Sequence, residues 1–336
     1  MSNNVKAGHK NKQSYANTRT TGKEQYYTSK EVVDLCIAEV QKHIDLKDKT
    51  LLEPCGGTGE FIKGFQRIGI STSSIISYDI EPKHHLVKQG NYLKTDFSSH
   101  KDLISITNPP FGRASSLAKQ FFEHATSHCE YICYLVPKSW RKWTVHNSLD
   151  KNFHLISDIE MPKNCFYLSD GTTKEANVLN TVFQIWQRKK KKRKTIKVPD
   201  HKLIKKMQPK KKEVPVYRKT GDRIFYEVVG SDIVKVEDEL FTKDIQKRPD
   251  KIKGANFEMI VFGHSCGQCK ELDPNQEYEA KTTTMYLKID RDDVKEALRK
   301  IDFSKYYNNV AYVQALSIQE INYELNEWFG LKNFKF

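Results

Sequence analysis

Four consecutive residues in the middle of the chain could do chemistry: Asn108, Pro109, Pro110 and Phe111. Each proline fixes φ at about −65° and lacks an N–H donor, and the residue before a proline is kept out of the helical region. We therefore expect two rigid acceptors, the Asn108 side-chain oxygen and the Pro109 carbonyl, beside the ring of Phe111. This arrangement suits the binding of a planar amine. The alternative is an ordinary proline-stiffened loop between a strand and a helix.

The pattern around these residues predicts strands that alternate with helices. Strands are expected at 50–54, 74–79, 91–97, 103–107, 131–136, 153–160 and 178–186, and helices after 28–29, up to 67, and over 115–125. Such alternation predicts a parallel sheet with helices on both faces, and ligands bind at the carboxyl ends of its strands. Four polar residues fall at that edge: Glu53, Asp79, Asp96 and Asn108.

A glycine-rich turn, Cys55-Gly56-Gly57-Thr58-Gly59, follows the first of these strands. Its glycines would let the backbone approach a ligand closely, because no Cβ intrudes. The G-x-G-x-x-G spacing is absent, and no Lys-Ser/Thr pair follows the last glycine, so phosphate binding is not supported. Asp79, at the end of the second strand, is well placed to accept hydrogen bonds from ribose hydroxyls.

The positive charge of the chain is concentrated in one segment. The 336 residues include 56 Lys and Arg against 42 Asp and Glu, a net charge of +14, and 188–213 alone holds 14 of these cations against two acids. A segment dense in Lys and Arg suits a polyanionic partner such as nucleic acid, because each phosphate that it neutralises releases a counterion. The alternatives are a solvated linker or a signal of the nuclear-localisation type over 189–194.

Other features bound the class of protein. The first 30 residues lack the apolar core of a signal peptide, and no apolar run approaches the ~18 residues of a membrane span, so we expect a cytoplasmic protein with no membrane partner. The seven cysteines are expected to be reduced. Cys266 and Cys269, near His264, could begin a zinc site, but a second Cys or His pair is not near in sequence, so we expect no metal.

Four regions are predicted along the chain: a disordered tail over 1–21, a catalytic domain over 22–187, a basic linker over 188–215 and a second, α+β domain over 216–336. In the last region the pattern predicts strands at 223–229, 257–262 and 284–289, and helices at 292–300 and 317–328.

Taken together, the motifs over about 22–187 resemble the gamma-type adenine-N6 DNA methyltransferases, which use S-adenosylmethionine. Asn108-Pro109-Pro110-Phe111 matches the catalytic motif of that family in full, and 53–59 is similar to its cofactor loop. The usual Thr-Pro before the first helix is Thr28-Ser29 here. Cytosine-N4 enzymes usually carry Ser in place of the Asn, and protein glutamine methyltransferases usually end the motif in Tyr, so the motif tolerates more than one acceptor.

The resemblance implies a Rossmann-like class I methyltransferase fold with a mostly parallel seven-stranded sheet. It implies catalytic roles for Asn108, Pro109 and Phe111, a ribose contact for Asp79 and an adenine contact for Asp96-Phe97. The full set of cofactor contacts that it implies is Tyr27, Thr28, Glu53, Cys55, Gly56, Gly57, Gly59, Phe61, Asp79, Asp96, Phe97 and Asn108.

The chemistry of the motif agrees with this family. The exocyclic amine of adenine is a poor nucleophile because its lone pair is delocalised, and two acceptors would localise that pair and aim it at the methyl donor. Phe111 would stack on a base flipped out of the duplex, and Phe166 or Tyr167 is the candidate for the opposite face, with simple packing as the alternative. Nucleic-acid contacts are expected from Lys189, Lys190, Lys191, Lys192, Arg193 and Lys194.

The sequence therefore predicts a site-specific DNA adenine-N6 methyltransferase whose region 216–336 recognises the target. An RNA adenine methyltransferase and an inactive nucleic-acid-binding relative are the alternatives. A restriction endonuclease is a candidate partner. The expected setting is the cytoplasm of a bacterial, phage-infected or virus-infected cell, or the nucleus in a eukaryote. The oligomeric state is not predicted.

Overall fold

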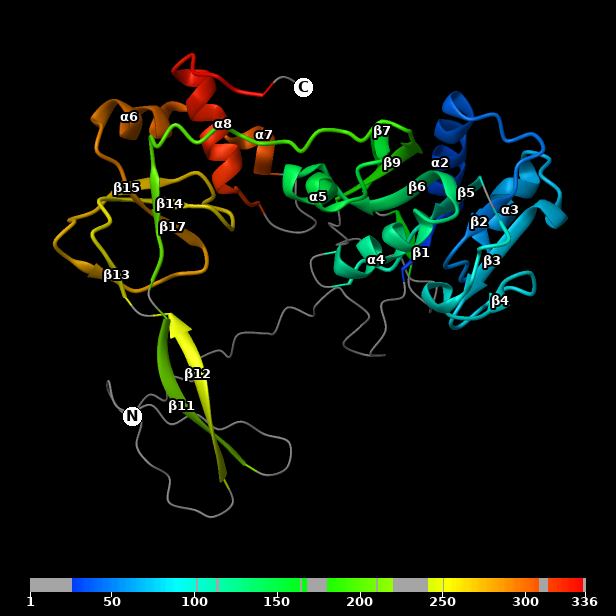
Figure 1. The fold of residues 1–336 in the computed structure, drawn as a ribbon, viewed down its shortest axis with the longest axis horizontal. Helices are drawn as coiled ribbons and strands as arrows, with labels where there is room; N and C mark the ends of the chain where they lie inside the picture. Colours follow the sequence, from blue (N-terminus) through cyan, green and yellow to red (C-terminus); the bar gives the residue numbers. More distant parts are fainter. Residues whose placement is uncertain are drawn as a thin grey trace, which may run out of the picture. The chain divides into compact units, whose positions relative to one another are not determined.

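The computed structural model describes residues 26–100, 102–112, 115–163, 165–167, 180–209, 211–219, 241–249, 251–307 and 314–334 (Figure 1). The chain divides into two compact units, and the division between them falls between Ile196 and Lys197. This division lies inside 188–215, the segment that the sequence predicted to be a linker. The two units are described separately below.

The first unit is built on a seven-stranded sheet with the order β4-β3-β2-β5-β6-β9-β7. Its strands are β2 (Leu51–Glu53), β3 (Ile75–Asp79), β4 (Lys88–Gln89), β5 (Leu103–Thr107), β6 (Cys129–Pro137), β7 (Phe153–Glu160) and β9 (Thr181–Arg188). All neighbouring pairs are parallel except those of β9, which runs antiparallel to both β6 and β7. This confirms the predicted fold class, a Rossmann-like, mostly parallel sheet.

Helices cover both faces of this sheet, and the alternation of side chains along its strands explains why. Leu51 and Ile104 belong to an apolar cluster with α2 (Lys30–His43) and α3 (Glu60–Arg67). Leu52 and Leu103 belong to a second cluster with α4 (Ser116–Ala125) and α5 (Trp143–Ser148). Successive residues of a strand point to opposite faces. The central strands β2 and β5 are buried at every position and so are covered by helices on both sides.

One predicted strand is wrong. Residues 91–97 do not form a strand, because Asn91 begins a short 3-10 helix, η2 (Tyr92–Lys94), and its side chain accepts a hydrogen bond from the Leu93 amide at 3.0 Å. Asn side chains favour such turns because they bond nearby backbone N–H groups. The third strand of the sheet is instead β4, which is two residues long and pairs with the end of β3. The described residues of this unit also include the short 3-10 helices η1 (Thr72–Ser74) and η4 (Lys138–Arg141).

A second, two-stranded sheet was not expected from the sequence. β1 (Tyr27–Thr28) pairs antiparallel with β8 (Phe166–Tyr167), and the Ser29 amide donates to the Cys165 carbonyl at 2.9 Å. Ser29 then caps α2 through its hydroxyl. The pairing brings the start of the described chain to the connection between β7 and β9.

The second unit is α+β, as predicted. Its four-stranded sheet has the order β10-β17-β14-β15, with β10 (Lys205–Met207), β14 (Phe257–Ile260), β15 (Cys269–Glu271) and β17 (Thr284–Lys288). Two further sheets of two strands each pair β11 (Lys211–Lys219) with β12 (Phe241–Pro249) and β13 (Ile252–Lys253) with β16 (Glu277–Tyr278). The described helices of this unit are α6 (Asp292–Lys300), α7 (Ser304–Tyr307) and α8 (Ile318–Trp328). The strand predicted at 223–229 lies outside the described residues.

Two absences apply to the described part of the chain. No group of His, Cys, Asp and Glu side chains there could hold a metal ion, and this includes Cys266 and Cys269. No helix there is long and apolar enough to cross a bilayer.

Candidate active site

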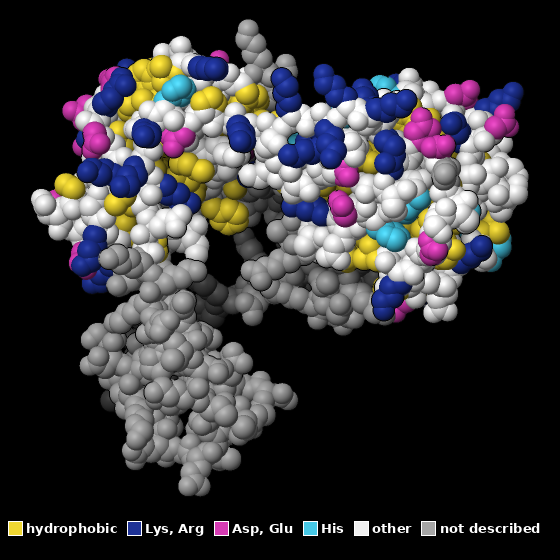
Figure 2. All heavy atoms as spheres, in the orientation of Figure 1, with side chains coloured by type: hydrophobic (Ala, Val, Ile, Leu, Met, Phe, Trp, Pro, Cys, Tyr) yellow, Lys and Arg dark blue, Asp and Glu magenta, His cyan; other side chains and the backbone are white. Residues whose placement is uncertain are grey.

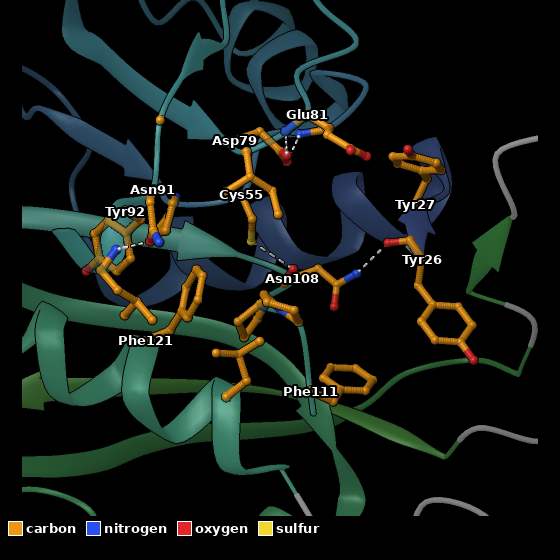
Figure 3. A pocket seen from close by; sticks show the side chains of 18 residues that line it. Tyr26, Tyr27, Cys55, Asp79, Glu81, Asn91, Tyr92, Asn108, Phe111 and Phe121 are labelled. Atoms are coloured by element: carbon orange, nitrogen blue, oxygen red, sulfur yellow. Dashed lines mark hydrogen bonds between the residues drawn. The ribbon is translucent and has the colours of Figure 1, made fainter. Parts of the chain in front are cut away.

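A cavity of about 240 Å³ opens at the carboxyl edge of the seven-stranded sheet (Figure 3). Its walls come from the residues after β2, β3, β4 and β5, together with β1 and α4. Pro54, Asp79, Asn91 and Asn108 therefore meet although they are far apart in the sequence. Parallel strands explain this, because their carboxyl ends share one edge.

Asn108 is held by two hydrogen bonds, and both leave its side-chain oxygen as an acceptor. Its Nδ2 donates to the Tyr26 carbonyl at 3.1 Å, so the amide orientation follows from chemistry: only the NH₂ group can donate to a carbonyl. Its own carbonyl accepts from the Cys55 thiol at 3.1 Å (Figure 3). Burial holds the pKa of Cys55 well above its usual range, so the thiol keeps its proton.

The Oδ1 atom of Asn108 is buried and has no hydrogen-bond partner within the described part of the chain. Leaving a buried acceptor without a partner costs about 1–3 kcal/mol. A buried acceptor without a partner is typical of a site where a ligand supplies the hydrogen-bond donor. The Pro109 carbonyl follows directly in the chain, and Pro109 also lines the cavity.

Asp79 is fixed by the backbone at the end of β3. Its Oδ2 accepts from the Gly57 amide and its Oδ1 from the Glu81 amide, each at 2.8 Å (Figure 3). A carboxylate has about four acceptor positions, so two remain for ligand hydroxyls. Tyr27 also lines the cavity, and its burial and the nearby Asp79 carboxylate raise the pKa of its hydroxyl.

The glycines of the turn are required by close contacts. A Cβ on Gly56 would lie 2.2 Å from Ser77 Oγ, and a Cβ on Gly59 would lie 2.5 Å from the His84 ring. Gly57 and Gly59 also have positive φ angles of 46° and 73°, which side-chain-bearing residues rarely adopt. Of the three glycines, Gly57 lines the cavity.

Glu53 lies behind the turn and does not line the cavity. Its side chain is buried, and Ser77 Oγ donates to its Oε2 at 3.0 Å. Burial raises the pKa of Glu53 to about 8, against the effect of the Ser77 hydrogen bond. Two further residues of the predicted cofactor set, Thr28 and Phe61, are buried outside the cavity wall as well.

The structure does not bring Asp96 and Phe97 to the cavity. The Asp96 carboxylate is exposed and accepts from the amide and hydroxyl of Ser98 at 2.8 and 2.9 Å. Phe97 is buried in the core and stacks on His128 with ring centroids 4.6 Å apart. Both residues lie outside the cavity wall because the third strand, β4, ends at Gln89, earlier than expected.

Other residues stand where Asp96-Phe97 was expected. Asn91, Tyr92 and Leu93 follow β4 and line the cavity, and so do Ile80 and Glu81 after β3. Sequence reasoning missed all five. Ile80 and Glu81 could have been found because they directly follow Asp79. The only sequence signal for Asn91 is a polar residue after Gly90, which also marks ordinary turns.

Phe111 lines the cavity, but its ring does not form a parallel-walled slot with that of Phe166. Phe111 and Phe166 are both buried and meet edge to face, with centroids 6.3 Å apart and planes at 76°. A base stacked between two parallel rings needs two gaps of roughly 3.4 Å each, about 7 Å in all. Tyr167 lies elsewhere: its hydroxyl hydrogen-bonds Thr58 Oγ1 at 2.8 Å and its ring pairs with Tyr27.

The basic residues of 189–194 lie away from the cavity. Arg188 ends β9 and donates to the carbonyl of Cys129, the first residue of β6, at 3.0 Å. Asn108 follows Thr107, which pairs with Tyr134 further along the same strand. The basic segment therefore starts at the opposite edge of the sheet, because antiparallel β9 carries the chain back.

Comparisons with known proteins give structural likenesses alone. No family model matches the chain, and no curated protein does. The M protein of the type I restriction enzyme EcoKI is 16% identical over 49% of this chain and 44% of its own, with a TM-score of 0.38. A type I restriction-modification methyltransferase subunit of Streptococcus thermophilus is 15% identical over 49% and 44%, with a TM-score of 0.35. A Thermoplasma acidophilum protein is 16% identical over 51% of this chain and 94% of its own, with a TM-score of 0.36.

The chain thus spans less than half the length of the two restriction-enzyme subunits. At these identities and TM-scores the likenesses carry no argument about activity. The fold assignment rests on the strand order, and the chemistry rests on the cavity: two adjacent acceptors at Asn108 and Pro109, an acid fixed by backbone amides at Asp79, and an apolar and aromatic wall.

Proposed function

We propose that the cavity binds S-adenosylmethionine and that the chain transfers its methyl group to the N6 amine of adenine in DNA. The observation that carries this proposal is the buried Asn108 Oδ1 without a partner, beside the Pro109 carbonyl. A neutral amine with two N–H groups is a ligand that two adjacent acceptors can bind, whereas a carboxylate or phosphate is not.

The residues present fit the cofactor. Asp79 would accept hydrogen bonds from the ribose hydroxyls, because two of its acceptor positions are not used by the backbone. Asn91 offers a polar group and Ile80 an apolar side chain for the adenine ring. Ile80 is 55% exposed, and a planar ligand would cover it. When bound, the cofactor supplies a methyl group on a positively charged sulfur.

The protein would act mainly by positioning. Asn108 Oδ1 and the Pro109 carbonyl would accept one N–H each from the adenine amine and so localise its lone pair. The same acceptors would stabilise the positive charge that develops on nitrogen during transfer. A strong base is not needed before transfer, since the methylated amine loses its proton afterwards. Phe111 would contact the base, and this requires a rearrangement of the Phe111–Phe166 pair.

The second unit is proposed to recognise the target. The amino-acid composition supports this proposal, because the positively charged stretch continues from Lys197 through β10 into β11. RNA remains the alternative substrate, because the acceptor pair binds the same amine in either polymer.

The test is transfer of a labelled methyl group to duplex DNA, single-stranded DNA and RNA, with nuclease digestion of the product. We expect N6-methyladenine from DNA with the wild-type chain and at least a hundredfold slower transfer with Asn108→Ala, a loss typical of positioning and electrostatic groups. Cofactor affinity, measured by calorimetry, should be nearly unchanged in that variant. Retained transfer by Asn108→Ala would refute the assigned role, and label in RNA alone would replace the proposed substrate.

A further inference from the structure

The segment from Arg188 to Ile196 is fixed to the first unit along its whole length. The Lys189 amide donates to the Asn152 carbonyl at 2.7 Å, and the Arg193 amide to the Lys151 carbonyl at 2.8 Å. His154 on β7 hydrogen-bonds the Lys191 carbonyl at 2.7 Å. At the end of the segment, Ile196 and the Asn147 side chain exchange two hydrogen bonds of 2.9 and 2.7 Å. The backbone of this segment is therefore not that of a solvated linker.

Arg193 is the one basic residue of 189–194 that turns inward. Its guanidinium donates to the carbonyls of His146, Leu149 and Phe153, the first two at the end of α5 and the last on β7. It also lies over the Trp186 ring at 5.6 Å, and burial lowers its pKa. A cation at a helix C-terminus is stabilised by the carbonyls there, so Arg193 has a structural role.

The other five basic residues, Lys189, Lys190, Lys191, Lys192 and Lys194, are exposed; we refer to them as the lysine surface. None of the five forms an ion pair with a carboxylate of the described chain. Asp102 and Glu130 line the same hollow as Lys189 and Lys190, and Glu130 pairs with Lys49 at 3.4 Å. Figure 2 shows Lys and Arg side chains gathered where the chain leaves β9.

The lysine surface and the cavity are separated by the length of the central strands. The segment starts level with Cys129, and Asn108 lies just beyond the level of Tyr134, five residues along β6. A strand rises about 3.3 Å per residue, so the separation along the sheet is at least roughly 17 Å. Nucleic acid advances about 3.4 Å per nucleotide, so this corresponds to about five nucleotides.

We propose that the lysine surface is a second nucleic-acid-binding site, which holds the phosphate backbone of a long substrate about five or more nucleotides from the methylated adenine. The inference rests on the proposed function. Five unpaired ammonium groups on a fixed backbone match a polyanion. The run 189–195 contains no apolar side chain that could insert into a bilayer, which favours nucleic acid over a membrane surface.

The test compares two full-length variants. One carries Lys→Gln at all five positions, and the matched control carries Lys→Arg at the same positions and so keeps the charge. Binding is measured by fluorescence anisotropy as a function of salt, with a 30-base-pair duplex and with a five-nucleotide strand that has adenine at its centre. The short strand extends two nucleotides from the target, too few to reach the lysine surface.

On the long duplex, we expect Lys→Gln to weaken binding at least tenfold and to reduce the slope of log K against log salt by up to about 4.5, or 0.9 for each of five phosphate contacts. The Lys→Arg control and all measurements on the short strand should match wild type. An unchanged slope on the long duplex would overturn the proposal, and so would an equal loss on the short strand. Lysine-dependent binding to phosphatidylserine vesicles, with no effect on duplex binding, would replace it with a membrane surface.

The outcome is separable from that of the proposed function. Lysine-dependent duplex binding without any methyl transfer would leave the lysine surface in place and remove the reaction. If wild type and the Lys→Gln variant transfer the methyl group to the long duplex equally efficiently, the proposed reaction stands and the role of the lysine surface is removed.

Discussion

Glu53 allows a quantitative test of the site's electrostatics. It ends β2, is 1% exposed and accepts its hydrogen bond from Ser77 Oγ. Burial raises its pKa to about 8, and the carboxylates of Asp79 and Glu60 act in the same direction. In the unfolded chain a Glu has a pKa of about 4.3. The folded state therefore binds the proton more tightly, so the contribution of Glu53 to stability is full below pH 4.3 and is lost as the pH rises to about 8.

The size of this loss follows from linkage. Each pH unit between the two pKa values lowers the free energy of unfolding by about 1.4 kcal/mol. Between pH 5.5 and 7.5 the loss from Glu53 alone is therefore roughly 2–3 kcal/mol, and the total by pH 8 is on the order of 5 kcal/mol. Glu53→Gln removes the titration and keeps both the shape of the side chain and an acceptor for Ser77.

The assay is urea unfolding of wild type and Glu53→Gln at several pH values from 5.5 to 8.5. Buried Trp140 and Trp186 report on the first unit by fluorescence. The stability of the variant relative to wild type should rise by roughly 2–3 kcal/mol between pH 5.5 and 7.5 and level off above pH 8. Burial lowers the pKa of His128 and His146 to about 4, but these groups titrate alike in both proteins and cancel. A difference that stays flat with pH would refute the reasoning.

Three further changes test other parts of the first unit. Asp79→Ala should weaken cofactor binding about tenfold, through loss of two acceptor positions, as measured by calorimetry; an unchanged affinity would remove its proposed ribose contact. Gly56→Ala should destabilise the fold by about 1–3 kcal/mol through overpacking, because its Cβ would lie 2.2 Å from Ser77 Oγ; a urea midpoint equal to that of wild type would contradict the contact. Arg193→Met should cost about 1–3 kcal/mol in unfolding free energy, because buried carbonyls lose their donor. The exposed Lys192→Met is its control, and equal stability of the two variants would contradict the structural role of Arg193.

Much of the fold could be predicted because its elements carry strong local signals. β5 was predicted with the bounds that the structure has, since Leu103–Thr107 is an apolar run closed by Asn108-Pro109. α3 ends at Arg67 as predicted, just before Ile68 and the turn at Gly69. β4 could not be predicted, because two polar residues, Lys88 and Gln89, give no periodic pattern.

The same difference between strong and weak local signals separates the site residues that could be predicted from those that could not. Asp79 and Asn108 reach the cavity because Asp79 ends, and Asn108 directly follows, a strand that the sequence predicted. Asn91, and not Asp96, lines the cavity, because the residue that reaches the cavity is decided by where β4 ends. The Tyr26 group that contacts Asn108 is a backbone carbonyl, and residue type says nothing about where a carbonyl points. Composition likewise predicts that the lysines are charged, but the antiparallel course of β9 decides which edge they occupy.

The pairing of β1 with β8 has a consequence for the order in which the active site is assembled during synthesis. Tyr27 pairs with Tyr167, a partner 140 residues later in the chain. Contacts between such distant segments form late, because a long loop must close first. The Tyr26 carbonyl, which accepts from the Asn108 amide, belongs to the residue directly before this pairing. The central strands can therefore form on a nascent chain in which the Asn108 amide is still free to rotate, and this amide reaches its described orientation only when Phe166 and Tyr167 have been made.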